Sequence, residues 1–131
     1  MGMRADPLTN VVSLLRDRHP GLRAIYLFGS RATASARPDS DWDIGVLGTG
    51  FLPADLRSTS IFAANLLGAP TDLVDLRRAS PVLKAEVLRH GRPIFATDSA
   101  ELAKFEMEAL TEYQNLNESR KHILADFGMV A

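Results

Sequence analysis

The chain has 131 residues, a formal net charge of −1 at pH 7 and no cysteine. This length predicts a single domain, and a net charge near zero does not favour general binding to nucleic acid or to membranes. The absence of cysteine excludes a disulfide framework, a thiolate metal site and a cysteine nucleophile, and it fits a cytoplasmic protein. No signal peptide or membrane span is expected, because no apolar run approaches the necessary length of about 20 residues.

The N-terminal part of the chain predicts a helix followed by a strand. Thr9 can cap a helix that continues to about Arg18. The helix should end before Pro20, because the residue preceding a proline avoids helical conformation. Residues 22–28 then form a strand that is apolar on both faces, which favours a central position in a sheet.

A phosphate-binding turn is expected directly after this strand. Gly29 lets the backbone approach a ligand closely. Ser30 can cap a short helix over residues 31–36, and a helix N-terminus attracts anions. Arg31 adds a positive charge with forked donors suited to phosphate. We therefore predict that Gly29, Ser30 and Arg31 bind phosphate groups.

Two aspartates open the second strand, which should end at Leu47. Side chains alternate along a strand, so Asp41 and Asp43 should share one face, with their Cβ atoms about 6–7 Å apart. Trp42 and Ile44 should point the other way, toward the core. Adjacent carboxylates repel each other unless a cation lies between them. A hard divalent cation such as Mg²⁺ accepts oxygen ligands and also binds phosphate, so the pair predicts a metal site.

The remaining segments predict mixed α and β structure. Pro53 fits the first turn of a helix that reaches about Leu67, and residues 71–76 form a third strand. A further helix is capped by Ser80 and ends near Gly91, which would be its C′ residue, and a fourth strand follows it. The expected fold is therefore α+β, a small mixed sheet of about four strands, with the helices covering one side.

From Asp98 a helical pattern continues to about Phe127. Asp98 and Glu101 resemble a capping box, and residues 115–119 are a candidate for a break. The apolar positions recur at roughly helical spacing and are Leu102, Phe105, Met107, Leu110, Tyr113, Leu116, Ile123 and Leu124. Any of them that do not pack on the domain would mark an interaction surface. Residues 1–131 are thus expected to form one domain, with a core of about 10–97 and a C-terminal helical segment of about 98–127.

The central motif resembles that of a known family. Gly-Ser, ten residues and then Asp-x-Asp is the signature of the polymerase-β-like nucleotidyltransferases. The fuller pattern is similar to the minimal nucleotidyltransferase (MNT) antitoxins of the MntA type, which are paired with HEPN toxins. It includes YLFGSRA, RPDSDWDIGVL, DLVDLRRAS and GRPIFA, and the resemblance covers about residues 10 to 125.

The resemblance implies a polymerase-β-like core and transfer of a nucleotidyl group from ATP. Asp41, Asp43 and a third carboxylate would hold two Mg²⁺ ions, and the Gly29-Ser30-Arg31 segment would hold the β- and γ-phosphates. The implied acceptor is a tyrosine hydroxyl of a cognate HEPN ribonuclease toxin, which the added AMP would neutralise. The implied setting is cytoplasmic, with no direct binding to nucleic acid or membrane.

Two aspartates compete to be the third carboxylate. Asp72 and Asp75 lie on the third strand with opposite phase, so only one of them can face the site. Asp72 fits the pattern of the family better and is favoured, and Asp75 remains the alternative.

Two other functions remain open. One is transfer to a small molecule, as in the aminoglycoside nucleotidyltransferases, although those enzymes carry an added domain that this sequence does not show. The other is an antitoxin that blocks its toxin by binding alone, although binding does not require paired carboxylates on a strand.

Overall fold

The computed structural model describes the backbone of residues 6–126 and the side chains of residues 6–122. In chain order its elements are α1 (Pro7–Arg18), β1 (Leu22–Phe28), the 3₁₀ turn η1 (Gly29–Ala32), β2 (Trp42–Gly48), α2 (Pro53–Leu67), β3 (Thr71–Asp75), α3 (Pro81–His90), β4 (Arg92–Ala96) and α4 (Ser99–Asp126). The four strands form one sheet in the order β3-β2-β1-β4.

The sheet is mixed, as the sequence predicts. β1 is antiparallel to both of its neighbours, β2 and β4, whereas β2 and β3 are parallel. The α+β fold class and the central position of β1 are therefore confirmed. The position suits β1 because the strand is apolar on both faces, and nearly all of its side chains are buried there.

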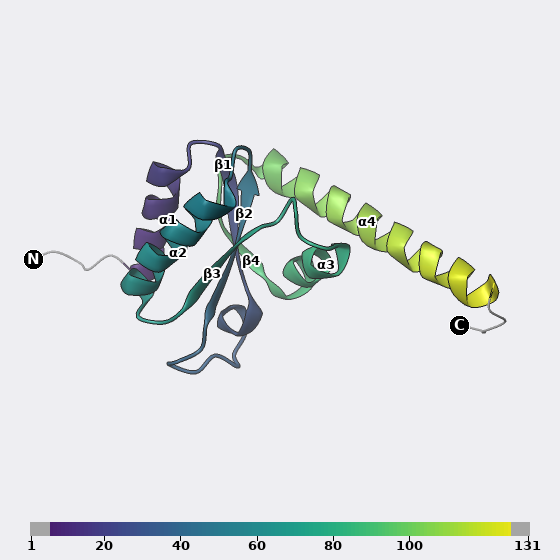
Figure 1. Ribbon diagram of the computed structural model, residues 1–131, viewed down its shortest axis with the longest axis horizontal. Helices are drawn as coiled ribbons and strands as arrows, with labels where there is room; N and C mark the ends of the chain where they lie inside the picture. The colour runs from purple at the N-terminus through teal and green to yellow at the C-terminus, as the bar shows by residue number, and fades with distance from the viewer. Residues whose placement is uncertain (1–5, 127–131) are drawn as a thin grey trace, which may run out of the picture.

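Helices cover both faces of the sheet, and the prediction that they cover only one side is wrong. Figure 1 shows α1 and α2 on one side of the strands and α3 with the start of α4 on the other. One apolar core joins Leu15 of α1 and Leu56 of α2 to Ile25 and Ile44 of the sheet. A second core joins Tyr26 on the opposite face to residues of α3 and α4. Two cores are needed because β1 is apolar on both faces.

The first helix begins earlier than predicted. The Asp6 carboxylate accepts a hydrogen bond of 3.2 Å from the backbone N–H of Leu8, and Pro7 occupies the first helical position. Thr9 is therefore inside α1 and does not cap it. A proline at this position fits well because its fixed φ is already helical and no N–H is lost from the helix.

The helices α3 and α4 begin where the sequence predicts. Ser80 caps α3 by accepting a 3.1 Å hydrogen bond from the N–H of Leu83, and Asp98 accepts one of 3.1 Å from Glu101. Gly91 directly follows α3 and has an extended conformation with φ −84°, instead of the left-handed conformation that is common after helices. A side chain at Gly91 would collide with the backbone carbonyls of Val87 and Leu27, so close packing of α3 on β1 requires a glycine.

α4 is one continuous helix through residues 115–119, so the predicted break is absent. Its first half packs on the domain through Phe105 and Ala109, which are both buried. Two of the predicted apolar positions are open to solvent, since Met107 is 69% and Leu110 47% exposed. In Figure 1 the second half of α4 extends beyond α3, away from the sheet. The predicted positions Ile123 and Leu124 lie outside the described side chains, and Phe127 lies outside the described residues.

Candidate active site

Two aspartates lie side by side at one end of the sheet. The register of the parallel pair places Asp43 of β2 opposite Asp72 of β3, and that of the antiparallel pair places Asp43 opposite Phe28 of β1. Neighbouring strands are about 4.8 Å apart, so the two aspartates are direct neighbours. Ile44 and Leu73, the next residues on each strand, belong to the core beneath α1 and α2. Alternation along the strands therefore turns both carboxylates toward the opposite face.

Asp41 stands just before this pair. β2 begins at Trp42, whose N–H donates a 2.9 Å hydrogen bond to Pro70, so Asp41 precedes the strand and is exposed. Trp42 packs against the core beneath α1 and α2, and Ile44 is fully buried within it. The predicted inward orientation of Trp42 and Ile44 is thus confirmed.

Asp43 lies in the negative electric field of the other two aspartates. Burial raises the pKa of Asp43 above its ordinary value, and the negative charges of Asp72 and then Asp41 raise it further. Among the described residues, no basic side chain forms an ion pair with any of the three. An uncompensated set of carboxylate oxygens is the donor set that a hard divalent cation prefers, so the donor chemistry of these residues fits Mg²⁺.

These three carboxylates do not form a closed cage. Within the part of the chain that the structure describes, no group of three or more His, Cys, Asp or Glu side chains is gathered closely enough to hold a metal ion. The register fixes the Asp43–Asp72 pair, whereas Asp41 belongs to the end of a loop. The Asp43–Asp72 pair would hold a divalent cation, and Asp41 would join it only if its side chain turned toward the pair.

The predicted phosphate turn lies directly against Asp43. Gly29 has a left-handed φ of +70°, and a Cβ atom there would overlap a carboxylate oxygen of Asp43. The glycine is therefore required both by its backbone conformation and by the closeness of the carboxylate. This contact places the Gly29-Ser30 segment and the aspartate pair in one site.

The turn is shorter than the helix that the sequence predicts over residues 31–36. Residues Gly29–Ala32 form a single 3₁₀ turn, and no side chain caps it. Ser30 therefore does not act as a helix cap, and no helix dipole is available to an anion. Among the described residues the Ser30 hydroxyl has no hydrogen-bond partner in the protein, although the Ser30 carbonyl accepts from Thr33. Phosphate binding at this turn would thus depend on the free hydroxyl and on nearby backbone N–H groups.

Comparison with known proteins identifies the family. Residues 10–100 match the family described as polymerase beta, nucleotidyltransferase. The chain belongs to this nucleotidyltransferase family. It is 36% identical over 117 residues to the protein adenylyltransferase MntA of Shewanella oneidensis, a match that covers 88% of this chain and 84% of the relative.

Solved structures agree with this assignment. The chain resembles a toxin-antitoxin structure with AMP-PNP, with a TM-score of 0.81, 34% identity, and coverage of 91% of this chain and 96% of that chain. It also resembles a complex of the tri-AMPylated Shewanella oneidensis HEPN toxin with an MNT antitoxin, with a TM-score of 0.77, 33% identity, and coverage of 92% and 95%. The predicted resemblance to the MNT antitoxins is confirmed.

The two candidates for the third carboxylate of this nucleotidyltransferase lie on opposite faces of β3. Asp72 faces Asp43, as described above. Asp75 faces the other way, where one carboxylate oxygen accepts a 3.2 Å hydrogen bond from the N–H of Arg77 and the other lies 3.9 Å from Arg78. The geometry therefore favours Asp72.

The side chain of Arg31 is engaged with the loop that follows the nucleotidyltransferase turn. Its Nε and Nη2 atoms donate to the carbonyl oxygen of Ser40 at 3.1 and 2.8 Å, and Nη2 also donates to that of Pro38 at 3.0 Å. The guanidinium carbon lies 4.4 Å from the centre of the Trp42 ring. Sequence reasoning missed the parts played by Pro38 and Ser40, since a backbone carbonyl acceptor leaves no signal in residue type.

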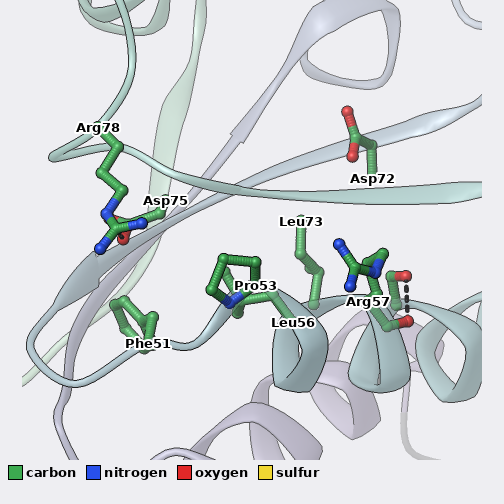
Figure 2. Close-up of a pocket in the computed structure, with 9 residues that line it drawn as sticks. Phe51, Pro53, Leu56, Arg57, Asp72, Leu73, Asp75 and Arg78 are labelled. Atoms are coloured by element: carbon green, nitrogen blue, oxygen red, sulfur yellow. Dashed lines mark hydrogen bonds and ion pairs between the residues drawn. The ribbon is translucent and has the colours of Figure 1, made fainter.

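A separate cavity of about 250 Å³ lies between α2 and β3. Figure 2 shows Phe51, Leu56 and Leu73 around it, with Arg57 and Arg78 nearby, whereas the carboxylate of Asp72 points to the other side of the strand. This cavity is therefore distinct from the aspartate site of the nucleotidyltransferase. No helix in the described part of the chain is long and apolar enough to cross a membrane.

Proposed function

We propose that this protein transfers AMP from ATP to a tyrosine hydroxyl of a cognate HEPN toxin and thereby neutralises the toxin. The observation that carries the proposal is the Asp43–Asp72 pair beside the Gly29-Ser30 turn. A relative with 36% identity bears the name protein adenylyltransferase, and a related MNT antitoxin is found in complex with a tri-AMPylated HEPN toxin. Those relatives support AMP as the group transferred and the toxin as its acceptor.

The proposal gives each residue of the site a role. Asp41, Asp43 and Asp72 hold Mg²⁺, with two ions expected from the family mechanism. When bound, these ions neutralise charge on the phosphates and favour deprotonation of the acceptor hydroxyl. The Ser30 hydroxyl and the backbone of Gly29 orient the β- and γ-phosphates. The tyrosine oxygen then forms a bond to the α-phosphorus, and pyrophosphate leaves.

The modification would act on the toxin through its charge and size. A phosphodiester on tyrosine adds negative charge and bulk, and these oppose the binding of a ribonuclease to the phosphates of its substrate. In this proposal residues 1–131 act as one nucleotidyltransferase domain in the cytoplasm, where ATP and Mg²⁺ are available. The proposal requires no direct contact with nucleic acid or with a membrane.

The test is intact-mass analysis of the toxin encoded beside this protein, after incubation of the two proteins with ATP and Mg²⁺. We expect the toxin to gain the mass of one or more AMP units on tyrosine, and the gain should be lost with Asp43→Asn. Asp75→Asn is the matched control, because it removes the same charge on the opposite face of β3.

Each alternative function predicts a different result. Neutralisation of the toxin without a change of mass would mean that the antitoxin acts by binding alone. Transfer of AMP to an aminoglycoside, with no modification of the toxin, would mean that the acceptor is a small molecule. Either result would overturn the proposal.

A further inference from the structure

The loop that joins the two halves of the site has little structure of its own. Residues 33–41 contain no helix or strand, and residues 33–39 are exposed. Exposed loops are normally among the most mobile parts of a protein. Asp41 lies at the end of this loop, so its position depends on whatever holds the loop in place.

Arg31 spans this loop from one end to the other. Three hydrogen bonds, of 2.8 to 3.1 Å, join its Nε and Nη2 atoms to the carbonyl oxygens of Pro38 and Ser40. Two further hydrogen bonds stabilise the turn at residues 37–40. The Arg37 N–H donates to the Ser40 hydroxyl at 2.8 Å, and the Ser40 N–H donates to the Arg37 carbonyl at 3.0 Å. The loop is therefore tied back to the phosphate turn at the point where it enters β2.

Arg31 also contacts the residue on the other side of Asp41. Its guanidinium stacks over the Trp42 ring at 4.4 Å. The indole Nε1 of Trp42 is buried and has no hydrogen-bond partner among the described residues, so packing and this stacking hold the ring. Arg31 thus contacts both neighbours of Asp41, the carbonyl of Ser40 before it and the ring of Trp42 after it.

We propose that Arg31 is a positioning residue, which fixes the backbone from which the Asp41 side chain can reach the Asp43–Asp72 pair, and that it is not a phosphate ligand. The inference rests on the proposed function in one respect, that the aspartates bind a divalent cation. The carbonyl of Ser40 belongs to the peptide group that leads into Asp41, so fixing that carbonyl fixes the backbone from which the Asp41 side chain extends. Three donor contacts on the loop leave the Nε and Nη2 atoms committed to it.

Substitution by lysine separates the two roles. Lysine keeps the positive charge and binds phosphate well as a point charge. It lacks the planar fork that lets Nε and Nη2 reach one carbonyl together, and it stacks less well on an aromatic ring. A phosphate ligand would therefore tolerate Arg31→Lys, whereas a residue that positions the loop would not.

The test uses the full chain and two binding measurements that need neither toxin nor AMP transfer. The first is the affinity for Mn²⁺, as a probe of the aspartates, and the second is the affinity for ATP in the presence of EDTA. Loss of a group that orients a metal ligand typically costs 10- to 100-fold in metal affinity. We expect Arg31→Lys and Arg31→Ala each to weaken Mn²⁺ binding by about this factor, while ATP affinity in EDTA changes less than about twofold.

Trp42 supplies a third readout, because it is the only tryptophan in the chain. Both Arg31 variants should raise the quenching of its fluorescence by acrylamide, since the stacked guanidinium no longer shields the ring. Arg37→Ala is the matched control, because it removes one positive charge from the same loop, and in the described structure only the backbone of Arg37 makes hydrogen bonds. It should leave Mn²⁺ affinity and quenching unchanged.

Three results would overturn the inference. One is wild-type Mn²⁺ affinity in Arg31→Lys, and another is loss of ATP affinity in EDTA for Arg31→Ala with Mn²⁺ affinity retained. The third is a wild-type protein that binds no Mn²⁺. If wild type binds Mn²⁺ and the Arg31 variants behave as expected, but the toxin gains no AMP, only the proposed function fails.

Discussion

Gly29 should be the most restrictive position in the phosphate turn. Its φ is +70°, and a Cβ atom there would overlap the carboxylate of Asp43. Gly29→Ala therefore carries two separate costs. The first is the strain of a left-handed conformation in a residue with a side chain, and the second is displacement of a carboxylate that the site needs.

Two other glycines separate these costs. Gly68 and Gly50 have φ values of +73° and +76°, and nothing lies within 4 Å of a Cβ atom built on either of them. Gly68→Ala and Gly50→Ala should each cost only the backbone strain, about 1–2 kcal/mol. Gly29→Ala should cost about 1–3 kcal/mol more, which is typical of overpacking. In a domain of this size each kcal/mol lowers the melting temperature by roughly 3–5 °C.

The assay is urea unfolding of the three alanine variants, each compared with wild type. Gly29→Ala is then measured again in an Asp43→Ala background, where the colliding carboxylate is absent. Most of the excess cost over Gly68→Ala should disappear in that background, because the two residues are in contact and their effects are coupled. A cost for Gly29→Ala no larger than that of Gly68→Ala, or an excess that persists without the Asp43 carboxylate, would refute the reasoning.

Three further predictions concern stability and catalysis. Burial and then Asp72 raise the pKa of Asp43 in the folded protein, so wild type should lose stability as pH rises from about 4 through that raised value. Asp43→Asn should lack this loss. If the unfolding free energies of wild type and Asp43→Asn, measured in urea, change with pH in parallel, the prediction is wrong. In single-turnover assays Asp72→Asn should slow AMP transfer by orders of magnitude and Asp75→Asn should not; the reverse ranking would exclude Asp72. The 2.8 Å ion pair of buried Lys84 with Glu112 predicts that Glu112→Gln costs about 1–3 kcal/mol on unfolding, and no change would contradict this.

The strands and the faces of their aspartates could be predicted because they depend on strand periodicity. Alternation along β2 and β3 is enough to place Asp43 on one face and to separate Asp72 from Asp75. The parallel pairing that sets Asp43 beside Asp72 could not be read from either strand alone. This pairing depends on β2 and β3 being neighbours in the sheet and running in the same direction, so that both strands start at the same end of the sheet.

The loop after the phosphate turn could not be predicted because its side chains compete with a helix. The Thr33 hydroxyl lies 2.7 Å from that of Ser35, and it accepts a 3.3 Å hydrogen bond from the backbone N–H of Ser35. Such local bonds offer the backbone an alternative to helical hydrogen bonding, so the turn stops at Ala32. The break expected at residues 115–119 fails for the opposite reason. That segment contains no proline or glycine, and the modest propensities of asparagine and serine do not stop a helix.

The site thus combines a rigid part with an adjustable one. The paired strands fix the positions of Asp43 and Asp72. Packing of the apolar cores on both faces of the sheet offsets the repulsion between the two carboxylates. Asp41 lies outside the strand, at the end of an exposed loop, so its distance from the pair can change without disturbing either core. Completion of the metal ligands therefore depends on the loop, and the contacts of Arg31 with Ser40 and Trp42 make the side chain of that arginine the element that sets it.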